Sequence, residues 1–200
     1  ASIDEPQRGY FRFYVPGVGT PFPEIGDSGR WIDAISGAAV GNYGSDRINW
    51  GIIQVYNSVH RYLTEGNLIE GEEARRIVSN MSSQISQLGF VDWARRMILR
   101  TWEQRLADVV RSHQRKVLDI NVSVFGFSRG AAQARAFVNR LFEIAKYNND
   151  GCEHLLAGIP LRFTFLGIFD TVASVGSSSM LRVAQGRMAW ASADMLSIHP

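Results

Sequence analysis

The fold of this chain is decided by residues 117–137, which read VLDINVSVFGFSRGAAQARAF. The first part, 117–127, is a β-branched and aromatic run that predicts a strand covered on both faces. After Ser128 the sequence changes to small residues and then to bulkier apolar ones, which predicts a helix over 129–147. Small residues at the start of this helix let it approach the sheet closely. A strand that leads directly into a helix is the basic unit of an α/β fold.

The turn between this strand and helix carries the first chemical signal. Gly126-Phe-Ser-Arg-Gly130 fits the Gly-x-Ser-x-Gly nucleophile elbow, in which glycines on either side of the serine avoid side-chain clashes. A serine hydroxyl needs an imidazole base and a carboxylate that orients it. We predict that Ser128 is the nucleophile and that the Arg129 N–H, at the positive end of the helix dipole, stabilises an oxyanion. The alternative is that the pattern arose by chance in a tight turn.

A second apolar run, 161–169, predicts another strand, and it ends at Asp170. A strand-helix-strand unit forms a right-handed parallel crossover, so Ser128 and Asp170 are expected at the same carboxyl edge of the sheet. The predicted fold is an α/β-hydrolase-like, mostly parallel sheet with helices on both faces. We predict that Asp170 is the triad acid. The alternative is that its carboxylate caps the turn that follows.

The base of the triad is less well defined by the sequence. In an α/β-hydrolase the histidine follows the acid, and His199 is the only histidine after Asp170. It lies one residue from the end of the sequence, where a side chain is poorly held. Two readings stay open: His199 is the base, or it is a bystander and the base lies beyond residue 200.

Upstream, residues 9–18 alternate apolar and polar side chains and predict a strand that ends in a glycine-rich turn. Gly17, Val18 and Gly19 are predicted to supply the second oxyanion N–H, and a simple turn is the alternative. A long loop is expected over 21–45.

Three amphipathic helices are predicted between this loop and the central strand. Ser45 or Asp46 is expected to cap the first of them. The third carries Arg95, Arg96 and Arg100, which we interpret as a solvated face. The helices are expected over 45–63, 70–88 and 90–116.

Composition narrows the class of protein further. The 200 residues carry a net charge of +2, and the basic residues are interspersed with acidic ones, which gives no support to nucleic-acid binding. Cys152 is the only cysteine, so no disulfide within the chain is possible. No stretch approaches the roughly 20 apolar residues of a membrane span, and the first residues lack the pattern of a secretory signal. We therefore expect a soluble globular protein.

Three segments together resemble the DUF2235 α/β-hydrolases, and specifically the Tle1-type lipase effectors of bacterial type VI secretion. They are 14–20 (YVPGVGT), 126–137 (GFSRGAAQARAF) and 166–176 (LGIFDTVASVG). The resemblance implies a phospholipase in which Ser128 is the nucleophile and Asp170 the acid, with no metal or organic cofactor. It also implies action on membrane phospholipids in the periplasm of a target cell. Implied protein partners are a cognate immunity protein and a component of the secretion spike.

The sequence departs from this family in two places. An Asp-Gly-Thr strand usually precedes the glycine-rich turn, and the family's histidine lies well beyond the equivalent of Pro200. We therefore expect residues 1–200 to form part of one catalytic domain that lacks an upstream strand and a downstream segment. Two alternatives to a phospholipase stay open: a hydrolase of small esters or peptides, and a non-catalytic binding module that retains the elbow as scaffold.

Overall fold

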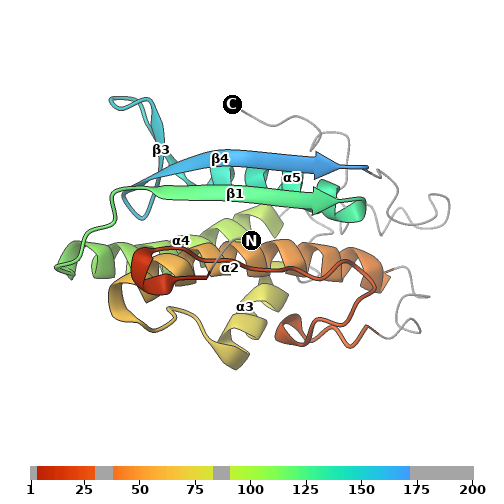
Figure 1. The fold of residues 1–200 in the computed structure, drawn as a ribbon. Helices are drawn as coiled ribbons and strands as arrows, with labels where there is room; N and C mark the ends of the chain where they lie inside the picture. Colours follow the sequence, from red (N-terminus) through yellow and green to blue (C-terminus); the bar gives the residue numbers. More distant parts are fainter. Residues whose placement is uncertain (1–3, 30–37, 83–90, 172–200) are drawn as a thin grey trace.

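A computed structural model describes residues 4–29, 38–82 and 91–171 of the chain (Figure 1). Two short 3-10 helices come first, and three long α-helices precede the first strand. A fourth α-helix, a short hairpin and a long strand follow. The elements are η1 (Pro6–Arg8), η2 (Pro23–Ile25), α2 (Ala38–Thr64), α3 (Gly71–Ser82), α4 (Val91–Ser112), β1 (Ile120–Phe127), α5 (Arg129–Ile144), β2 (Lys146–Asn148), β3 (Glu153–Leu156) and β4 (Ile159–Phe169).

The four strands form one mixed sheet in the order β1-β4-β3-β2. β1 and β4 pair in parallel, from Ile120 opposite Leu161 to Phe127 opposite Phe169, with a register shift between Val122 and Ser123. β4 pairs with β3, and β3 with β2, in antiparallel fashion. The predicted strand-helix-strand unit is therefore confirmed. The predicted mostly parallel sheet is not seen in the described residues, where one strand pair of three is parallel.

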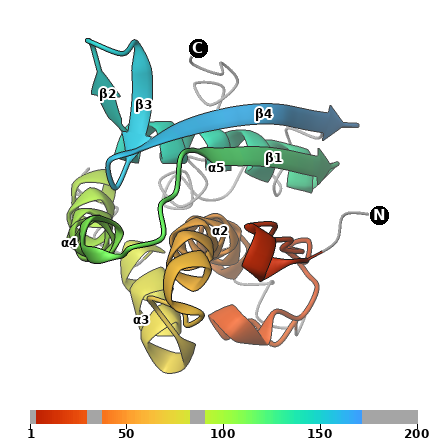
Figure 2. The same cartoon turned by 60° about the vertical axis from the view of Figure 1, so that its left-hand side comes forward.

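The described helices lie on one side of the sheet (Figure 2). α5 packs directly beneath β1 and β4, α2 lies beneath α5, and α3 is the lowest layer in this view. The opposite face of the β1/β4 pair carries exposed aromatic side chains, among them Phe125, Phe127, Phe165 and Phe169. The prediction of helices on both faces thus holds for one face within the described residues.

Small side chains explain how α5 comes close to the sheet. Ala131 and Ala136 are completely buried, and Ala132 and Ala134 are nearly so. Larger buried side chains, such as Leu141, follow in the second half of the helix. Since alanine adds little bulk beyond Cβ, the first half of α5 can lie against the sheet without a gap. The small-to-large gradient predicted from the sequence is confirmed.

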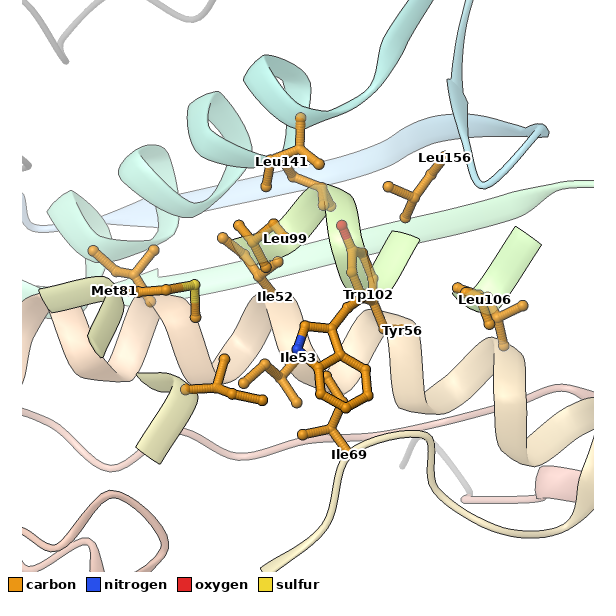
Figure 3. Packing of buried hydrophobic residues seen from close by; sticks show 14 of the residues in the cluster. Ile52, Ile53, Tyr56, Ile69, Met81, Leu99, Trp102, Leu106, Leu141 and Leu156 are labelled. Carbon is orange, nitrogen blue, oxygen red and sulfur yellow. The ribbon is translucent and has the colours of Figure 1, made fainter. Parts of the chain in front are cut away.

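The main core lies between α2, α3, α4 and the underside of α5 (Figure 3). Ile52, Tyr56 and Leu99 are fully buried at its centre, and Leu141 and Leu156 close it from the side of the sheet. Trp102 packs into the same cluster as a core residue. Burial of this apolar surface, at roughly 25 cal/mol per Å², is the main force that holds the helices to the sheet.

Residues 9–18 do not form the predicted strand. Glu5 and Tyr10 make an isolated bridge, and the chain that follows is extended but pairs with no strand in the described residues. The alternation has a different cause, because its apolar side chains contact α2. Phe13 packs edge-on against Trp50 with ring centroids 6.0 Å apart. The alternation of apolar and polar residues therefore reflects one face of this segment packing on a helix. It does not indicate a strand of the sheet.

Helix boundaries and the hairpin also differ from the prediction. α2 begins at Ala38, several residues before the predicted caps Ser45 and Asp46, both of which lie inside the helix. The predicted helix over 129–147 ends at Ile144, and the β2–β3 hairpin follows. The turn of this hairpin contains Asn149-Asp-Gly151, a run of turn-forming residues that signals it in the sequence. No helix among the described residues is long and apolar enough to cross a membrane.

Candidate functional site

Ser128 lies at the turn between β1 and α5, in a backbone conformation that is unusual for serine. Its φ is 54° and its ψ is −122°, and its side chain makes no capping hydrogen bond to the start of α5. The carbonyl of Ser128 accepts a 3.0 Å hydrogen bond from the N–H of Ala131, which begins the helix. A serine at a helix start normally caps the helix with its hydroxyl. Here the strained backbone turns the hydroxyl away from that role, and the residue is half-buried.

The two glycines of the elbow have different reasons to be there. A Cβ at Gly126 would lie 2.3 Å from the carbonyl oxygen of Gly130 and 2.7 Å from the Cα of Ala131, so any side chain would collide with the backbone of α5. A Cβ at Gly130 would meet no atom within 4 Å. The predicted steric requirement is therefore confirmed at the first glycine, while no clash with the described residues explains the second.

Asp170 follows the last residue of β4, in the same way that Ser128 follows β1. Phe127 and Phe169 are register partners, and the Ser128 N–H donates a 2.9 Å hydrogen bond to the carbonyl of Phe169. Asp170 also has a positive φ, of 48°, and its side chain is exposed. The structure therefore brings the predicted nucleophile and the predicted acid together on adjacent parallel strands, at the carboxyl edge.

His154 is too far away to serve as the base. It lies on β3, opposite Leu161, and its ring packs against Phe142 with centroids 4.7 Å apart. Phe169, at the elbow, is eight residues further along β4. At ~3.3 Å per residue this places His154 roughly 26 Å from the elbow.

The remaining histidines do not complete the triad within the described part of the chain. His60 lies near the end of α2, where its Nδ1 is 2.7 Å from the carbonyl of Gly66. His113 follows α4, and its Nδ1 accepts a 3.1 Å hydrogen bond from the Arg115 N–H. The C-terminal ends of α2 and α4 both lie at the end of the molecule from which β1 starts (Figure 1). His199 lies outside the described residues, so its predicted role is untested.

The first predicted oxyanion donor is well placed by the fold. Arg129 is the first residue of α5, and the first N–H groups of a helix have no acceptor within it. The N–H of Arg129 therefore lies at the end of α5 where the helix dipole favours negative charge. Its side chain is exposed.

The second predicted donor region forms a tight turn. The Thr20 N–H donates a 3.0 Å hydrogen bond to the carbonyl of Gly17, and Gly19 has a φ of +91°. A positive φ at the third residue is the mark of a type II turn. Val18 is buried, whereas Gly17 and Gly19 are exposed. The predicted glycine-rich turn is thus confirmed, with residues 17–20 as its four members.

Sequence reasoning missed the residue that holds this turn. Arg47, in the first half of α2, is 1 % exposed and forms an ion pair of 2.8 Å with Asp27. Within the sequence it appears as one more basic residue in an amphipathic helix, so periodicity gives no signal for it. A similar error affects Arg95, which was predicted to lie on a solvated face but is 4 % exposed and paired with Glu143 at 3.1 Å. Arg96 and Arg100 are exposed as predicted.

Together these features place three kinds of chemical group at one edge of the sheet. A hydroxyl is presented at a strained bend, a carboxylate lies on the neighbouring strand, and unused amides begin the adjacent helix. Within residues 4–29, 38–82 and 91–171, no group of three or more His, Cys, Asp or Glu gathers to hold a metal ion. A serine, a carboxylate and free amides are groups that nucleophilic acyl transfer uses, and a base is not found among the described residues.

Comparison with known proteins finds similarity to a solved structure. No protein-family model matches the sequence, and no curated protein matches it. The crystal structure of an uncharacterized protein from Pseudomonas aeruginosa matches with a TM-score of 0.74 and 32 % sequence identity over 92 % of this chain. This chain covers 26 % of that protein. The fold described above is therefore similar to a part of a larger bacterial protein.

Proposed function

We propose that this chain belongs to a serine hydrolase of the α/β-hydrolase type, in which Ser128 attacks an ester carbonyl and Asp170 orients the base. The observation that carries the proposal is the positive φ of Ser128 between a strand and a helix, one strand away from Asp170. Strain of this kind costs roughly 1–3 kcal/mol and is concentrated at functional sites. A serine with a purely structural role would adopt an ordinary capping conformation instead.

The reaction follows from the residues in this arrangement. The Ser128 oxygen forms a bond to the carbonyl carbon while an imidazole takes its proton, and the carbonyl oxygen becomes an oxyanion. The Arg129 N–H and a second amide stabilise that charge. Collapse of the intermediate expels the alcohol, which takes the proton from the imidazole, and a water molecule then releases the acid. We assign the base to His199 or to a histidine beyond residue 200.

The substrate class rests on the family resemblance. The segments 14–20, 126–137 and 166–176 resemble phospholipase effectors of type VI secretion, so the proposed substrate is the acyl ester of a membrane phospholipid. Delivery to the periplasm of a target cell, a cognate immunity protein and a contact with the secretion spike are proposals of the same origin. They complete the hypothesis of an antibacterial lipase.

The proposal is tested with Ser128→Ala and a matched control, Ser123→Ala, both made in the full-length protein. Ser123 lies on the same strand, and its hydroxyl bonds to Thr164 at 2.8 Å on the exposed face of the sheet. We expect wild type and the control to react with a fluorophosphonate probe and to release fatty acid from vesicles of phosphatidylethanolamine and phosphatidylglycerol. Ser128→Ala should do neither.

Other results would favour the alternatives. Rapid labelling at Ser128 with turnover of soluble short-chain esters, and no turnover of vesicles, would indicate a hydrolase of small esters. Failure of the wild-type full chain to label would contradict an activated serine and favour a binding module. Fatty-acid release that persists in Ser128→Ala would refute the assignment of the nucleophile.

A further inference from the structure

Arg47 makes an unusual set of contacts with the turn at 17–20. Its Nε donates a 2.7 Å hydrogen bond to the carbonyl of Pro16, and one terminal nitrogen donates to the carbonyls of Gly17 at 3.2 Å and Thr20 at 2.7 Å. That same nitrogen is 2.8 Å from a carboxylate oxygen of Asp27. A planar guanidinium can bind several acceptors at once, which a lysine ammonium cannot do in the same geometry. The turn is therefore clamped to α2 by one buried side chain.

The clamp fixes the direction of the amide that follows. In a trans peptide the carbonyl and the next N–H point in opposite directions. The carbonyl of Gly17 points toward Arg47 and also accepts the N–H of Thr20, so the N–H of Val18 must point away from α2. Among the described residues, the Val18 N–H donates to no backbone carbonyl, although Val18 is 6 % exposed. A buried residue with an unused N–H is uncommon, because lost solvation of the donor is costly.

Contacts between α2 and α5 connect this clamp to the elbow. The Nε2 of Gln133, one turn into α5, is 3.5 Å from the carbonyl of Gly44, which lies one turn before Arg47 on α2. Arg140 donates to the hydroxyl of Ser45 at 3.1 Å. The turn lies at the end of the molecule toward which the arrows of β1 and β4 point (Figure 1). The clamped turn and the start of α5 are thus built on the same pair of packed helices.

We propose that Arg47 is a positioning residue, which orients the Val18 N–H as the second oxyanion donor opposite the Arg129 N–H. This inference rests on the proposed hydrolase function. It adds the residue that fixes the direction of the second oxyanion-binding N–H before substrate binds. Without the clamp, the Gly17 carbonyl keeps only its bond from the Thr20 N–H, so the turn is held less firmly to α2 and the direction of the Val18 N–H is less fixed. Asp27 helps to hold Arg47 in this position, because its carboxylate balances the buried charge of the guanidinium.

A purely structural role for Arg47 makes a different prediction, and two pairs of variants separate the two roles. Arg47→Lys keeps the charge but cannot hold all the acceptors. Arg95→Lys is its matched control, since Arg95 is also a buried arginine and is ion-paired with Glu143 on α5. Val18→Pro removes the N–H and keeps the turn, because proline is favoured at the second position of a type II turn. Val18→Ala keeps that N–H and changes only the side chain.

The measurements are kcat, KM, the affinity for an alkyl boronic acid and thermal unfolding, all in the full chain. We expect Val18→Pro to lower kcat about 10²-fold or more relative to Val18→Ala, the usual effect of losing one oxyanion donor. Arg47→Lys should lower kcat at least about tenfold relative to Arg95→Lys. In both cases the boronic acid, which forms a tetrahedral adduct with serine, should lose affinity in parallel with kcat while KM changes less than about twofold.

The outcomes distinguish this inference from the proposed function. If Ser128-dependent hydrolysis is absent from the wild-type protein, the hydrolase proposal fails and this inference fails with it. If the wild type hydrolyses esters through Ser128 but Val18→Pro matches Val18→Ala, the inference alone is wrong. Equal kcat in Arg47→Lys and Arg95→Lys, with equal losses of thermal stability, would show that Arg47 has a structural role only. If Arg47→Lys does not fold, the Val18 pair decides the question.

Discussion

The backbone N–H of Ser128 donates a hydrogen bond of 2.9 Å to the carbonyl of Phe169. This bond continues the parallel ladder beyond its last register pair, Phe127 and Phe169, into the elbow itself. A positive φ at a serine persists only where the surrounding structure enforces it. The tip of β4 therefore helps to hold Ser128 in its strained conformation and sets Asp170 on the adjacent strand end.

The two glycines of the elbow should respond differently to alanine. We expect Gly126→Ala to lower the free energy of unfolding by about 2–3 kcal/mol or more, because its Cβ would lie 2.3 Å from the Gly130 carbonyl. Gly130→Ala has open space and should be neutral or stabilising by up to about 1 kcal/mol, since alanine favours a helix. Denaturant unfolding of the two variants of the full chain measures this. Equal effects would contradict the geometry of the elbow.

Asp170→Asn tests the role of the acid. Loss of the carboxylate should lower kcat for ester hydrolysis by about 10³–10⁴-fold, because a triad acid fixes the orientation and tautomer of the imidazole. Thermal stability should change little, since Asp170 is exposed. Asp150→Asn, an exposed aspartate in the hairpin turn, is the control and should retain wild-type kcat. A kcat for Asp170→Asn within a factor of three of wild type would remove Asp170 from the triad.

The connection between α2 and α3 depends on one buried amide. The Asn57 side chain accepts hydrogen bonds from the N–H groups of Leu68 and Ile69, at 3.1 and 3.0 Å, and donates one of 3.0 Å to the carbonyl of Ile69. Asn57→Ala should therefore destabilise the fold by about 2–4 kcal/mol, because buried backbone groups lose their partners.

Ser58→Ala is the matched control for this position. The Ser58 hydroxyl bonds to the carbonyl of Gln54 within its own helix, so its loss should cost less than about 1 kcal/mol. Urea unfolding measures both changes. A loss in Asn57→Ala no larger than that in Ser58→Ala would show that the amide does not hold the connection.

Glu103 should make stability depend on pH. Burial raises the pKa of this carboxyl above its ordinary value, although the Ala157 N–H, Lys146 and Arg100 oppose the shift. Since the folded state then holds its proton more tightly than the unfolded state, the free energy of unfolding falls as pH rises from the ordinary glutamate pKa through the raised one. Above that range the loss is complete.

Glu103→Gln should remove this dependence. The amide oxygen can still accept the 3.2 Å hydrogen bond from the Ala157 N–H, and no buried carboxylate has to be charged at neutral pH. We expect the variant to gain stability relative to wild type as pH rises from 4 to 8, measured by chemical unfolding at each pH. The same pH profile in both proteins would show that Glu103 is not the group responsible.

Local sequence was sufficient for the elbow and its immediate neighbours. The change from a β-branched run to small residues at Ser128 predicted β1, α5 and the bend between them, because strand and helix preferences there are strong and agree with each other. The apolar run at 161–169 predicted β4 and the position of Asp170. Short polar elements were missed: β2 has only three residues, Lys146–Asn148, and too little pattern to be recognised.

Only the tertiary structure decided what the alternation at 9–18 and the charge at Arg47 mean. An apolar face has the same sequence pattern whether it packs on a strand or, as Phe13 does on Trp50, on a helix. Likewise, an arginine in an amphipathic helix has the same sequence signal whether it is solvated or, like Arg47, enclosed by a turn about thirty residues earlier in the chain. The sequence by itself determined the strand-turn-helix unit that presents Ser128, because that motif is made by neighbouring residues. The tertiary structure decided which distant groups surround it, because contacts across the chain depend on how its elements pack.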